Sequence, residues 1–464
     1  MKRSIVRIAS LTLENIKNVK NGTICMPNME KKILSPARAE VLGIYGQNGS
    51  GKTAIVDALF FVQKIMLGFP IDDSLADYIA TDAENAEIAV EFNLFGESVV
   101  YEVGYKLCLR REEKGVIISR ETLSLAKNEN GKRTNKTVFM DYQREVQDTV
   151  FKPQKRFIEL ISANKELFTD LIVARKIAEK SNCSYIFGES SREIFCSENT
   201  SNFEPYGPVI SALFEFAFKD LFVIRNAHSG VISTNDVLPM AFRVENEEMG
   251  AKGDFAVSLT EPIVVEEEEA TLLRTIIEQI NTVLCTIIPG LQITIREYGK
   301  QAMDNGEEGW KLELMSKRDD MNEIPIRMES EGIIKIISIL NAWIQAFGSA
   351  AICLVIDELD AGIFEYMLGE LLDIFNKSAK GQLIFTSHNL RALEMLEKEN
   401  IMFSTTNPNN RYIHMKNVRE SNNLRNMFIR SITLGGQSEQ IYEETDSLKI
   451  ARAFRKAGRG VRHE

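Results

Sequence analysis

The residues best suited to chemistry form one short segment early in the chain, with a glycine-rich centre followed by a lysine and a threonine. They are Gly46, Gln47, Asn48, Gly49, Ser50, Gly51, Lys52 and Thr53. This order matches the phosphate-binding loop G-x-x-x-x-G-K-[ST], whose glycines let successive backbone N–H groups face a phosphate. Lys52 would reach the β- and γ-phosphates, and the Thr53 hydroxyl would be a ligand of Mg²⁺. The pattern predicts a nucleotide site; a glycine-rich turn without a ligand is the alternative.

Two flanking segments have the patterns needed to position this loop. Before it, residues 40–46 (EVLGIYG) are apolar and strand-like. After it, residues 53–67 (TAIVDALFFVQKIML) carry apolar residues at helical spacing. We therefore expect a strand, the loop and then a helix, whose N-terminus adds a partial positive charge toward a bound phosphate.

A second, carboxylate-bearing strand is expected within residues 350–362 (AAICLVIDELDAG), where an apolar run ends in Asp357 and Glu358. Such a run is typical of a buried parallel strand, and ligands bind at the carboxyl ends of strands in open α/β sheets. Asp357 would hold Mg²⁺ through its water shell, and Glu358 would polarise the attacking water as general base. Within residues 381–396, another short strand ends at His388, which is then placed to reach the γ-phosphate.

The composition is that of an ordinary globular protein. The chain has 464 residues, of which 44% are hydrophobic and 26% charged, and it is long enough for two or three domains. No apolar run approaches the roughly 18 residues that cross a bilayer, and we expect a cytoplasmic protein without a signal peptide. The formal net charge of −11 does not favour a polyanion as partner. Six dispersed cysteines without a C-x-x-C pair indicate neither a disulfide framework nor a zinc site.

The order of these motifs resembles that of the ABC-type ATPase heads of the SMC and RecF group. The segments that carry the resemblance are the phosphate loop, MESEGIIKIISILNAW, LVIDELDAGI and LIFTSHN. More narrowly, the chain is similar to the single-chain ABC-like AAA ATPases of bacterial antiphage-defence and abortive-infection loci, which include the PARIS and OLD-like ATPases. The resemblance implies an α/β fold. An ABC-type P-loop head with a mixed sheet would cover residues 1–125 and 325–464, and an inserted, mostly helical lobe with some strands would cover 126–324.

The resemblance also implies roles at a dimer interface. Ser330 and Gly332 match the Ser-x-Gly signature that opens a helix and closes on the γ-phosphate held by the other subunit. A serine and exposed N–H groups at a helix start suit an anion, although a capped helix without a nucleotide role is the alternative. Glu329 and Glu331 depart from the commoner Leu-Ser-Gly-Gly form and add negative charge there. Asp360 matches the loop that crosses the interface in such heads, whereas the family's glutamine position has no match.

The middle of the chain predicts further elements. Residues 87–94 and 99–108 alternate as strands, which indicates the antiparallel sheet beside the nucleotide core of such heads. Residues 155–180 and 266–288 have the periodicity of amphipathic helices. A strand pair near 291–315 would lead back into the head. No heptad pattern persists through several repeats, which excludes the long coiled coil of SMC proteins.

Two other polar groups have a structural interpretation. Arg225 and His228 follow an apolar run at 221–224 and are interpreted as a surface loop rather than a catalytic pair. The basic end of the chain, residues 451–464, is interpreted as a solvated helix end, with a binding arm as the alternative.

Together these features predict an ATPase that uses ATP and Mg²⁺ and acts as a nucleotide-driven switch in a homodimer or higher homo-oligomer. By resemblance, the expected use is antiphage sensing and control of a toxic effector nuclease in a separate partner chain. A DNA repair or recombination ATPase of the RecF kind is the main alternative, and it predicts a basic face and DNA-stimulated hydrolysis. The long separation between the phosphate loop and Ser330 disfavours the nucleotide-binding subunit of a membrane transporter, so no membrane partner is expected.

Overall fold

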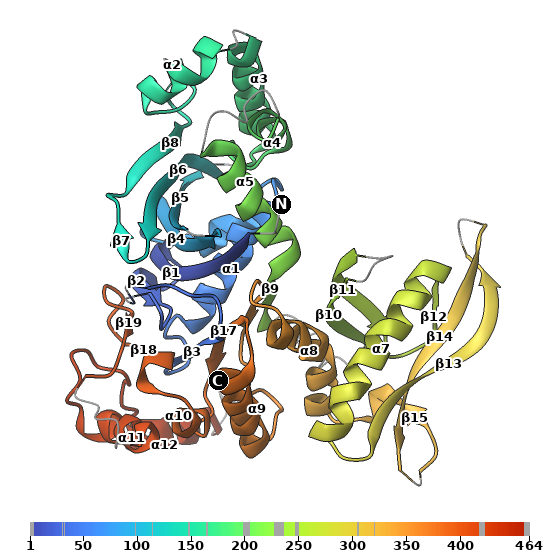
Figure 1. Cartoon of the computed structure of the whole chain (residues 1–464). Coiled ribbons are helices and arrows are strands. Elements are labelled where there is room, and N and C mark those ends of the chain that lie inside the picture. The colour runs from blue at the N-terminus through green and yellow to red at the C-terminus, as the bar shows by residue number, and fades with distance from the viewer. Residues whose placement is uncertain are drawn as a thin grey trace, which may run out of the picture.

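The structure is a computed structural model of the chain, shown in Figure 1. The residues that it describes are 4–29, 31, 33–97, 99–113, 115–146, 149–163, 166–197, 205–226, 236–245, 250–303, 306–319, 321–416 and 423–458. They form a mixed α/β architecture with one largely parallel sheet and three antiparallel sheets. The predicted α/β class is therefore confirmed.

A six-stranded sheet forms the centre of the molecule, in the order β19-β18-β3-β17-β16-β9. Its strands are β3 (Glu40–Tyr45), β9 (Leu221–Ile224), β16 (Cys353–Ile356), β17 (Gln382–Ser387), β18 (Ile401–Ser404) and β19 (Tyr412–Ile413). Neighbouring strands pair in parallel except β19, which runs antiparallel to β18. The carboxyl ends of β3, β17, β16 and β9 therefore meet at one edge of the sheet, which is where ligands bind in such folds.

Both faces of this sheet are covered. On β3, Leu42 lies in one hydrophobic core, which also contains α1 (Lys52–Met66) and the large antiparallel sheet. The preceding residue, Val41, points to the opposite face and lies in a second core with α8 (Glu331–Gly348) and α9 (Glu365–Ser378). The strands read as continuous apolar runs because each must bury side chains on both faces.

A seven-stranded antiparallel sheet packs against the other side of α1. Its strands are β1 (Ile5–Ile16), β2 (Val19–Cys25), β4 (Asn85–Phe95), β5 (Val100–Glu112), β6 (Gly115–Glu129), β7 (Lys132–Arg133) and β8 (Thr137–Gln143), and the short helix η1 (Asp73–Tyr78) precedes β4. The strand order is β2-β1-β4-β5-β6-β7, and β8 also pairs with β6. Arg7 of β1 is 1% exposed and donates to Glu40 Oε2 at 3.0 Å and to the carbonyl oxygen of Ala350 at 3.2 Å. These bonds tie the two sheets together.

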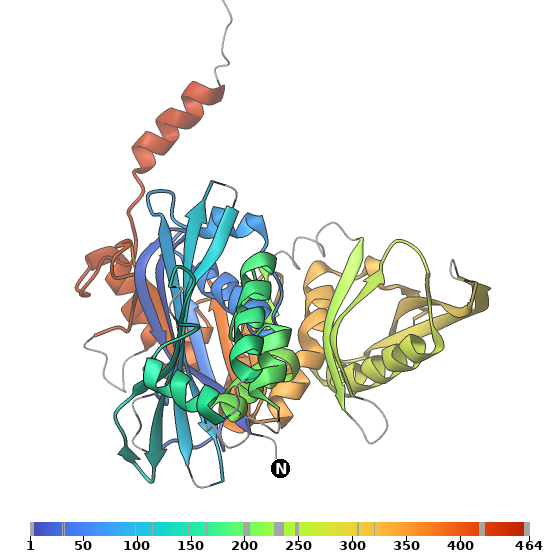
Figure 2. The same cartoon turned by 90° about the horizontal axis from the view of Figure 1, so that it is seen from above.

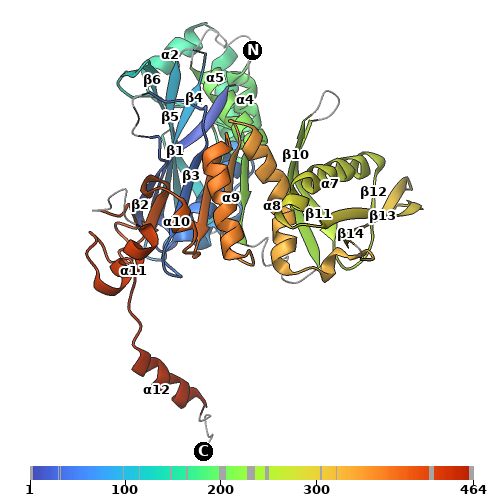
Figure 3. The same ribbon diagram turned by 60° about the horizontal axis from the view of Figure 1, so that its bottom comes forward.

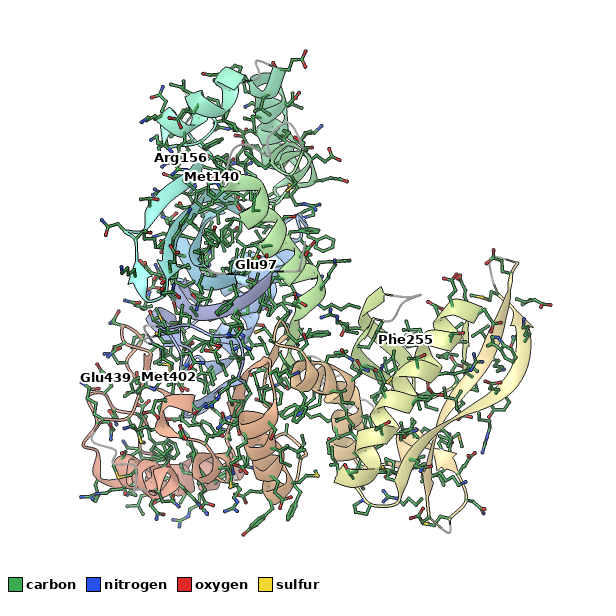
Figure 4. All side chains as sticks on the ribbon, in the orientation of Figure 1. Glu97, Met140, Arg156, Phe255, Met402 and Glu439 are labelled. Atoms are coloured by element: carbon green, nitrogen blue, oxygen red, sulfur yellow. The ribbon has the colours of Figure 1, made fainter. Side chains whose placement is uncertain are left out.

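Four helices cover this sheet and lead back to the central one. They are α2 (Gln154–Ala163), α3 (Glu166–Ser181), α4 (Glu189–Phe195) and α5 (Tyr206–Glu215), followed by the π-helical turn η3 (Phe216–Asp220) before β9. Figure 4 shows the side chains around Met140 filling the space between β8 and α5. Buried Glu121 of β6 accepts hydrogen bonds from Tyr105 Oη (2.7 Å), Ser184 Oγ (2.6 Å) and the Tyr185 N–H (2.7 Å), which fixes the turn after α3 on the sheet. Burial raises the pKa of Glu121.

A separate lobe lies on one side of the molecule, beyond α8 (Figure 2). Its elements are β10 (Val237–Glu245), β11 (Gly250–Ser258), β12 (Ile263–Val265), α7 (Glu267–Ile287), β13 (Leu291–Ala302), β14 (Glu308–Arg318), β15 (Ile324–Pro325) and η4 (Ile326–Met328). Asn341 of α8 accepts from the Arg243 N–H at 3.0 Å and donates to Gln279 Oε1 at 2.7 Å. Helix α8 thus packs against both the lobe and the central sheet.

The last part of the chain begins after β17. Its further elements are α10 (Ala392–Met395), η5 (Lys398–Asn400), α11 (Leu424–Leu434) and α12 (Ser447–Gly458). Helix α11 packs on the central sheet, where the rings of Phe428 and Phe403 stack with centroids 5.0 Å apart. Helix α12 projects away from the rest of the chain (Figure 3).

The structure divides the chain differently from the expected head (1–125 and 325–464) and inserted lobe (126–324). Strand β6 runs across the expected boundary, and β8 and α2 to α5 pack on the antiparallel sheet. Strand β9 pairs with β16 and so completes the central sheet. The lobe that remains, from β10 to η4, is mainly strand in its described part. The periodicity of the sequence predicts the helices but not the sheet on which they pack.

Three findings concern functional classes. No helix in the described ranges is long and apolar enough to cross a membrane. All six cysteines are free, and Cys353 is buried in β16. Within the part of the chain that the structure describes, no group of three or more His, Cys, Asp and Glu side chains is arranged to hold a metal.

Candidate nucleotide-binding site

The phosphate loop connects β3 to α1 through glycines in left-handed conformations. Gly46, Gly49 and Gly51 have φ values of 153°, 76° and 90°, which residues with a Cβ atom rarely adopt. A Cβ atom on Gly46 would also lie 3.0 Å from the carbonyl oxygen of Ser404 in β18. At Gly49 no atom of the described residues lies within 4 Å of such an atom, and Asn48 is exposed. The loop therefore has a closely packed base and an open tip, as an anion cradle requires.

Segments on both sides hold this loop in place. Asn18, in the turn between β1 and β2, donates to the carbonyl oxygen of Gly49. Tyr412 of β19 donates to the carbonyl oxygen of Gly51 at 2.7 Å, and Ser50 is buried at 6% exposure. These bonds fix the shape of the loop, and within it the Ser50 N–H donates to the carbonyl oxygen of Gln47 at 3.2 Å.

Lys52 is the first residue of α1 and is 6% exposed. Its Nζ donates to the carbonyl oxygens of Gly46 at 3.0 Å and Gln47 at 3.1 Å. Burial lowers the pKa of Lys52, and the carboxylates that follow β16 act in the opposite direction. The central sheet has therefore brought the loop lysine and the predicted acidic residues together, with Thr53 in the same first turn of α1.

Two carboxylates at this edge have buried oxygen atoms without a hydrogen-bond partner among the described residues. Asp357 Oδ1 accepts from Thr386 Oγ1 at 2.6 Å, but its Oδ2 has no donor. Asp360 Oδ1 is also buried and has no donor among these residues. An unpaired buried carboxylate oxygen is costly, so these atoms fit a cation or its bound water. Thr53 and Asp357 fit Mg²⁺ well, because this ion keeps several waters and needs few protein ligands.

Glu358 has an unusual backbone for a residue with a long side chain. Its φ of 46° is in the left-handed region, which costs a non-glycine residue about 1–2 kcal/mol. The Glu358 N–H donates to Thr386 Oγ1 at 2.8 Å, and its carbonyl oxygen accepts from Lys335 Nζ. Strain of this kind persists where surrounding bonds enforce it and clusters at functional sites.

His388 follows β17 and joins the same group of residues. Its backbone N–H donates to Asp360 Oδ2 at 3.0 Å. The pKa of His388 is lowered, first by partial burial and next by the Lys52 ammonium group. The imidazole is therefore neutral at pH 7, and it lies within electrostatic range of the loop lysine.

The signature residues lie at the start of α8. Ser330 is the N-cap and accepts a hydrogen bond from the Ile333 N–H, yet the residue is exposed. Gly332 is buried against Gly362, in the turn after the acidic strand. Glu329 pairs with Arg318 at 2.7 Å, so its charge is directed to β14. Within the described chain, neither Ser330 nor Gly332 forms a hydrogen bond with the phosphate loop.

Lys335 has no role in the sequence-based prediction but belongs to this site. The residue is 5% exposed, and the burial lowers its pKa while the carboxylates after β16 oppose this. A lysine inside the apolar run GIIKIIS is the sequence signal that could have revealed it. The hydroxyl of Thr386, which binds both Asp357 and the backbone of Glu358, carried no such signal.

Arg225 also lies in this region, contrary to its interpretation as part of a surface loop. It follows β9, and its Nε lies 3.0 Å from Oδ1 of buried Asp57 on α1. Lys17 pairs with the other oxygen of Asp57, and Arg225 also donates to Tyr78 Oη at 3.1 Å. Asp57 is one helical turn after Thr53, so Arg225 links the end of β9 to the phosphate-loop helix. His228 lies outside the described residues.

Comparisons with known proteins can be set against this geometry. Residues 10–226 match a protein-family model described as an AAA domain. Similar solved structures include an Smc head domain with an extended coiled coil bound to the C-terminal domain of ScpA, from Pyrococcus furiosus (15% identity, TM-score 0.41, 88% of this chain and 96% of that chain). Another is the SMC head domain from Thermotoga maritima (14% identity, TM-score 0.37, 88% and 99%). No curated protein sequence matches the chain. The stretch that is similar to the AAA domain family contains the phosphate loop and ends just after β9.

Proposed function

We propose that this chain binds ATP on the phosphate loop, hydrolyses it, and acts as a switch in which two copies close on two ATP molecules. The observation that carries the proposal is the composition of one sheet edge. Lys52 lies there beside Asp357 and Asp360, each of which has a buried oxygen atom without a partner in the described chain. A polyphosphate with Mg²⁺ supplies an anion for the lysine and a cation for the carboxylates.

The residues of the chain would have separate tasks in hydrolysis. The loop N–H groups and Lys52 would hold the phosphates, and Glu358 would accept the proton of the attacking water. His388, which is neutral because its pKa is lowered, would form a hydrogen bond beside the γ-phosphate. Mg²⁺, held by Thr53 and Asp357, would neutralise charge on the phosphate oxygens.

The exposed start of α8 supports the closed dimer. A helix N-terminus with a serine hydroxyl is an anion site, and among the described residues Ser330 forms no hydrogen bond to the phosphate loop of its own chain. Glu329 and Glu331 both place negative charge beside Ser330, and the ion pair with Arg318 neutralises the charge of Glu329. Ser330 and Gly332 of one copy would therefore face Lys52 of the other, and hydrolysis would be coupled to opening of the interface.

Glu358→Gln tests this proposal, because it removes the base and keeps the shape of the side chain. With ATP and Mg²⁺, phosphate release should fall by about 10²- to 10⁴-fold, while light scattering should show a persistent dimer. Glu397→Gln, which changes an exposed glutamate, is the matched control and should behave as wild type. Unchanged release would remove Glu358 from the role of base, and a constant mass with and without ATP would contradict the switch.

We further propose that the switch serves antiphage sensing and controls a toxic effector nuclease in a separate chain. This part rests on the motif resemblance alone. Bacteria that express the chain together with such an effector should form fewer phage plaques than bacteria without the chain. Lys52→Ala should abolish this protection, and equal plaque counts with and without the wild-type chain would contradict the role.

A further inference from the structure

The segment before α12 is held beside the phosphate loop. The Glu443 N–H donates to Gln47 Oε1 of that loop at 2.9 Å. Gln440 accepts from the Thr406 N–H at 2.8 Å through its carbonyl oxygen, and Ile441 is 3% exposed. Ser447, where α12 begins, is four residues after Glu443, and four residues span about 14 Å at most. Helix α12 therefore starts close to the nucleotide site.

Helix α12 packs against no other helix or strand of the described residues. None of its residues is buried, and Figures 2 and 3 show it projecting from the body. Ile450, Phe454 and Ala457 follow each other at helical spacing and form an apolar stripe, and Phe454 is 75% exposed. The other side carries Lys449, Arg452, Arg455 and Lys456. A helix of 12 residues is marginal in water without packing, so this one requires a surface to cover its apolar stripe.

A surface with the complementary character lies where α8 and α9 begin. We call it the α8–α9 face, and it consists of Met328, Glu331, Phe364, Glu365, Tyr366 and Glu370. The contact between Gly332 and Gly362 brings the two helix starts together. Met328 and Phe364 are each 68% exposed, and Tyr366 is 58% exposed. Three glutamates beside three exposed apolar side chains match a helix that is apolar on one side and basic on the other.

We propose that α12 docks in trans on the α8–α9 face of a second copy of this chain. The inference rests on the proposed dimer, in which the phosphate loop of one copy faces Ser330 of the other. That arrangement places the start of α12, fixed at Gln47, opposite the partner's α8–α9 face. Helix α12 is about 18 Å long, which is sufficient to cross the starts of two neighbouring helices. The arm locks the closed dimer from outside the nucleotide site.

The experiment uses the Glu358→Gln chain with ATP and Mg²⁺, in which dimers accumulate. Light scattering over a range of protein concentrations gives the dimer dissociation constant. Truncation after Asp446 should raise it by at least about 10-fold, because each dimer loses two docked helices. Arg452→Glu with Arg455→Glu should weaken the dimer in the same way, and adding Glu365→Arg with Glu370→Arg should restore it. Arg430→Glu, at an exposed position of α11, is the control for reversal of an arginine charge elsewhere and should have no effect.

The outcomes separate this inference from the proposed function. A dimer that forms with ATP but is indifferent to truncation overturns the docking of α12 and leaves the switch intact. The docking is also overturned if the glutamate reversals on the α8–α9 face do not restore the dimer that the arginine reversals weaken. It is overturned as well if truncation weakens the dimer only when DNA is added. Failure of every variant, including the untruncated one, to dimerise with ATP overturns both. Misfolding does not confuse the test, because α12 contributes no buried residue.

Discussion

Two glycines in α8 give the sharpest test of the site, because the structure predicts opposite effects of the same substitution. A Cβ atom on Gly332 would overlap the carbonyl group of Gly362, and it would lie 2.9 Å from the carbonyl carbon. Real Cβ atoms do not approach backbone this closely, so the turn at Gly362 must move. Gly348, at the other end of α8, is exposed, and a Cβ atom added there would have no atom of the described chain within 4 Å.

The magnitudes follow from packing and helix propensity. Overpacking costs about 1–3 kcal/mol, and alanine in a helix returns up to about 1 kcal/mol, so Gly332→Ala should destabilise the head by about 1–2 kcal/mol. Near the melting temperature of a large domain this lowers Tm by about 2–4 °C. Gly348→Ala meets no obstacle and should raise Tm by up to about 2 °C.

Catalysis should separate the two variants more strongly than stability. The turn at Gly362 carries Asp360 and follows Glu358, and a displacement of about 1 Å in a catalytic group can cost about 10²-fold in rate. We therefore expect Gly332→Ala to lower phosphate release by at least about 10-fold and Gly348→Ala to leave it unchanged. Thermal unfolding and a phosphate-release assay measure both effects. If Gly332→Ala has the Tm and turnover of wild type, the close packing of the two helix starts is refuted.

Three further substitutions probe the rest of the site. Thr386→Val removes the buried hydrogen bonds to Asp357 and Glu358 and should lower the free energy of unfolding by about 1–3 kcal/mol. Thr386→Ser keeps the hydroxyl and should retain the Tm and turnover of wild type. Equal Tm and turnover in the two variants would contradict a role for these hydrogen bonds. The pKa of His388 is lowered, so its imidazole becomes protonated, and phosphate release falls, only at a pH below the usual histidine pKa of about 6.5. The pH–rate profile of His388→Gln should lack this decrease at acidic pH. Arg225→Met leaves Lys17 as the remaining ion-pair partner of buried Asp57. Breaking a buried ion pair lowers the free energy of unfolding by about 3–5 kcal/mol, and because Lys17 remains we expect a loss of about 1–3 kcal/mol. Denaturant unfolding should show that loss, and an unchanged midpoint refutes it.

Local patterns in the sequence predicted the parts of the site that are themselves local. The strand, loop and helix around Lys52 are contiguous, and the structure has them as β3, the loop and α1. The apolar run before Asp357 forms β16, and the helix that Ser330 opens is α8. In each case the spacing of apolar residues predicts the type of secondary structure and the residue at which it ends.

Pairings between distant segments could not be predicted in the same way. LFVI is too short to distinguish a sheet strand from a buried turn, and its pairing with β16 depends on residues far along the chain. The ion pair between Arg225 and Asp57 depends on that pairing, so it was missed as well. The left-handed backbone of Glu358 arises from bonds to Thr386 and Lys335, which no single-segment pattern contains.

The place of β3 in the central sheet has a consequence for protein synthesis. Its two neighbours are β17 and β18, so the strand that carries the phosphate loop gains its first partner only with residue 382. At about 5–20 residues per second, the ribosome needs roughly 20–70 s to supply both neighbours, and an apolar strand stays without them for that time. Long-range parallel pairing of this kind is slow and exposes the nascent chain to aggregation, which favours early contact with chaperones. The segment translated last around the site, and not the phosphate loop, therefore decides when a newly made chain can first retain a nucleotide.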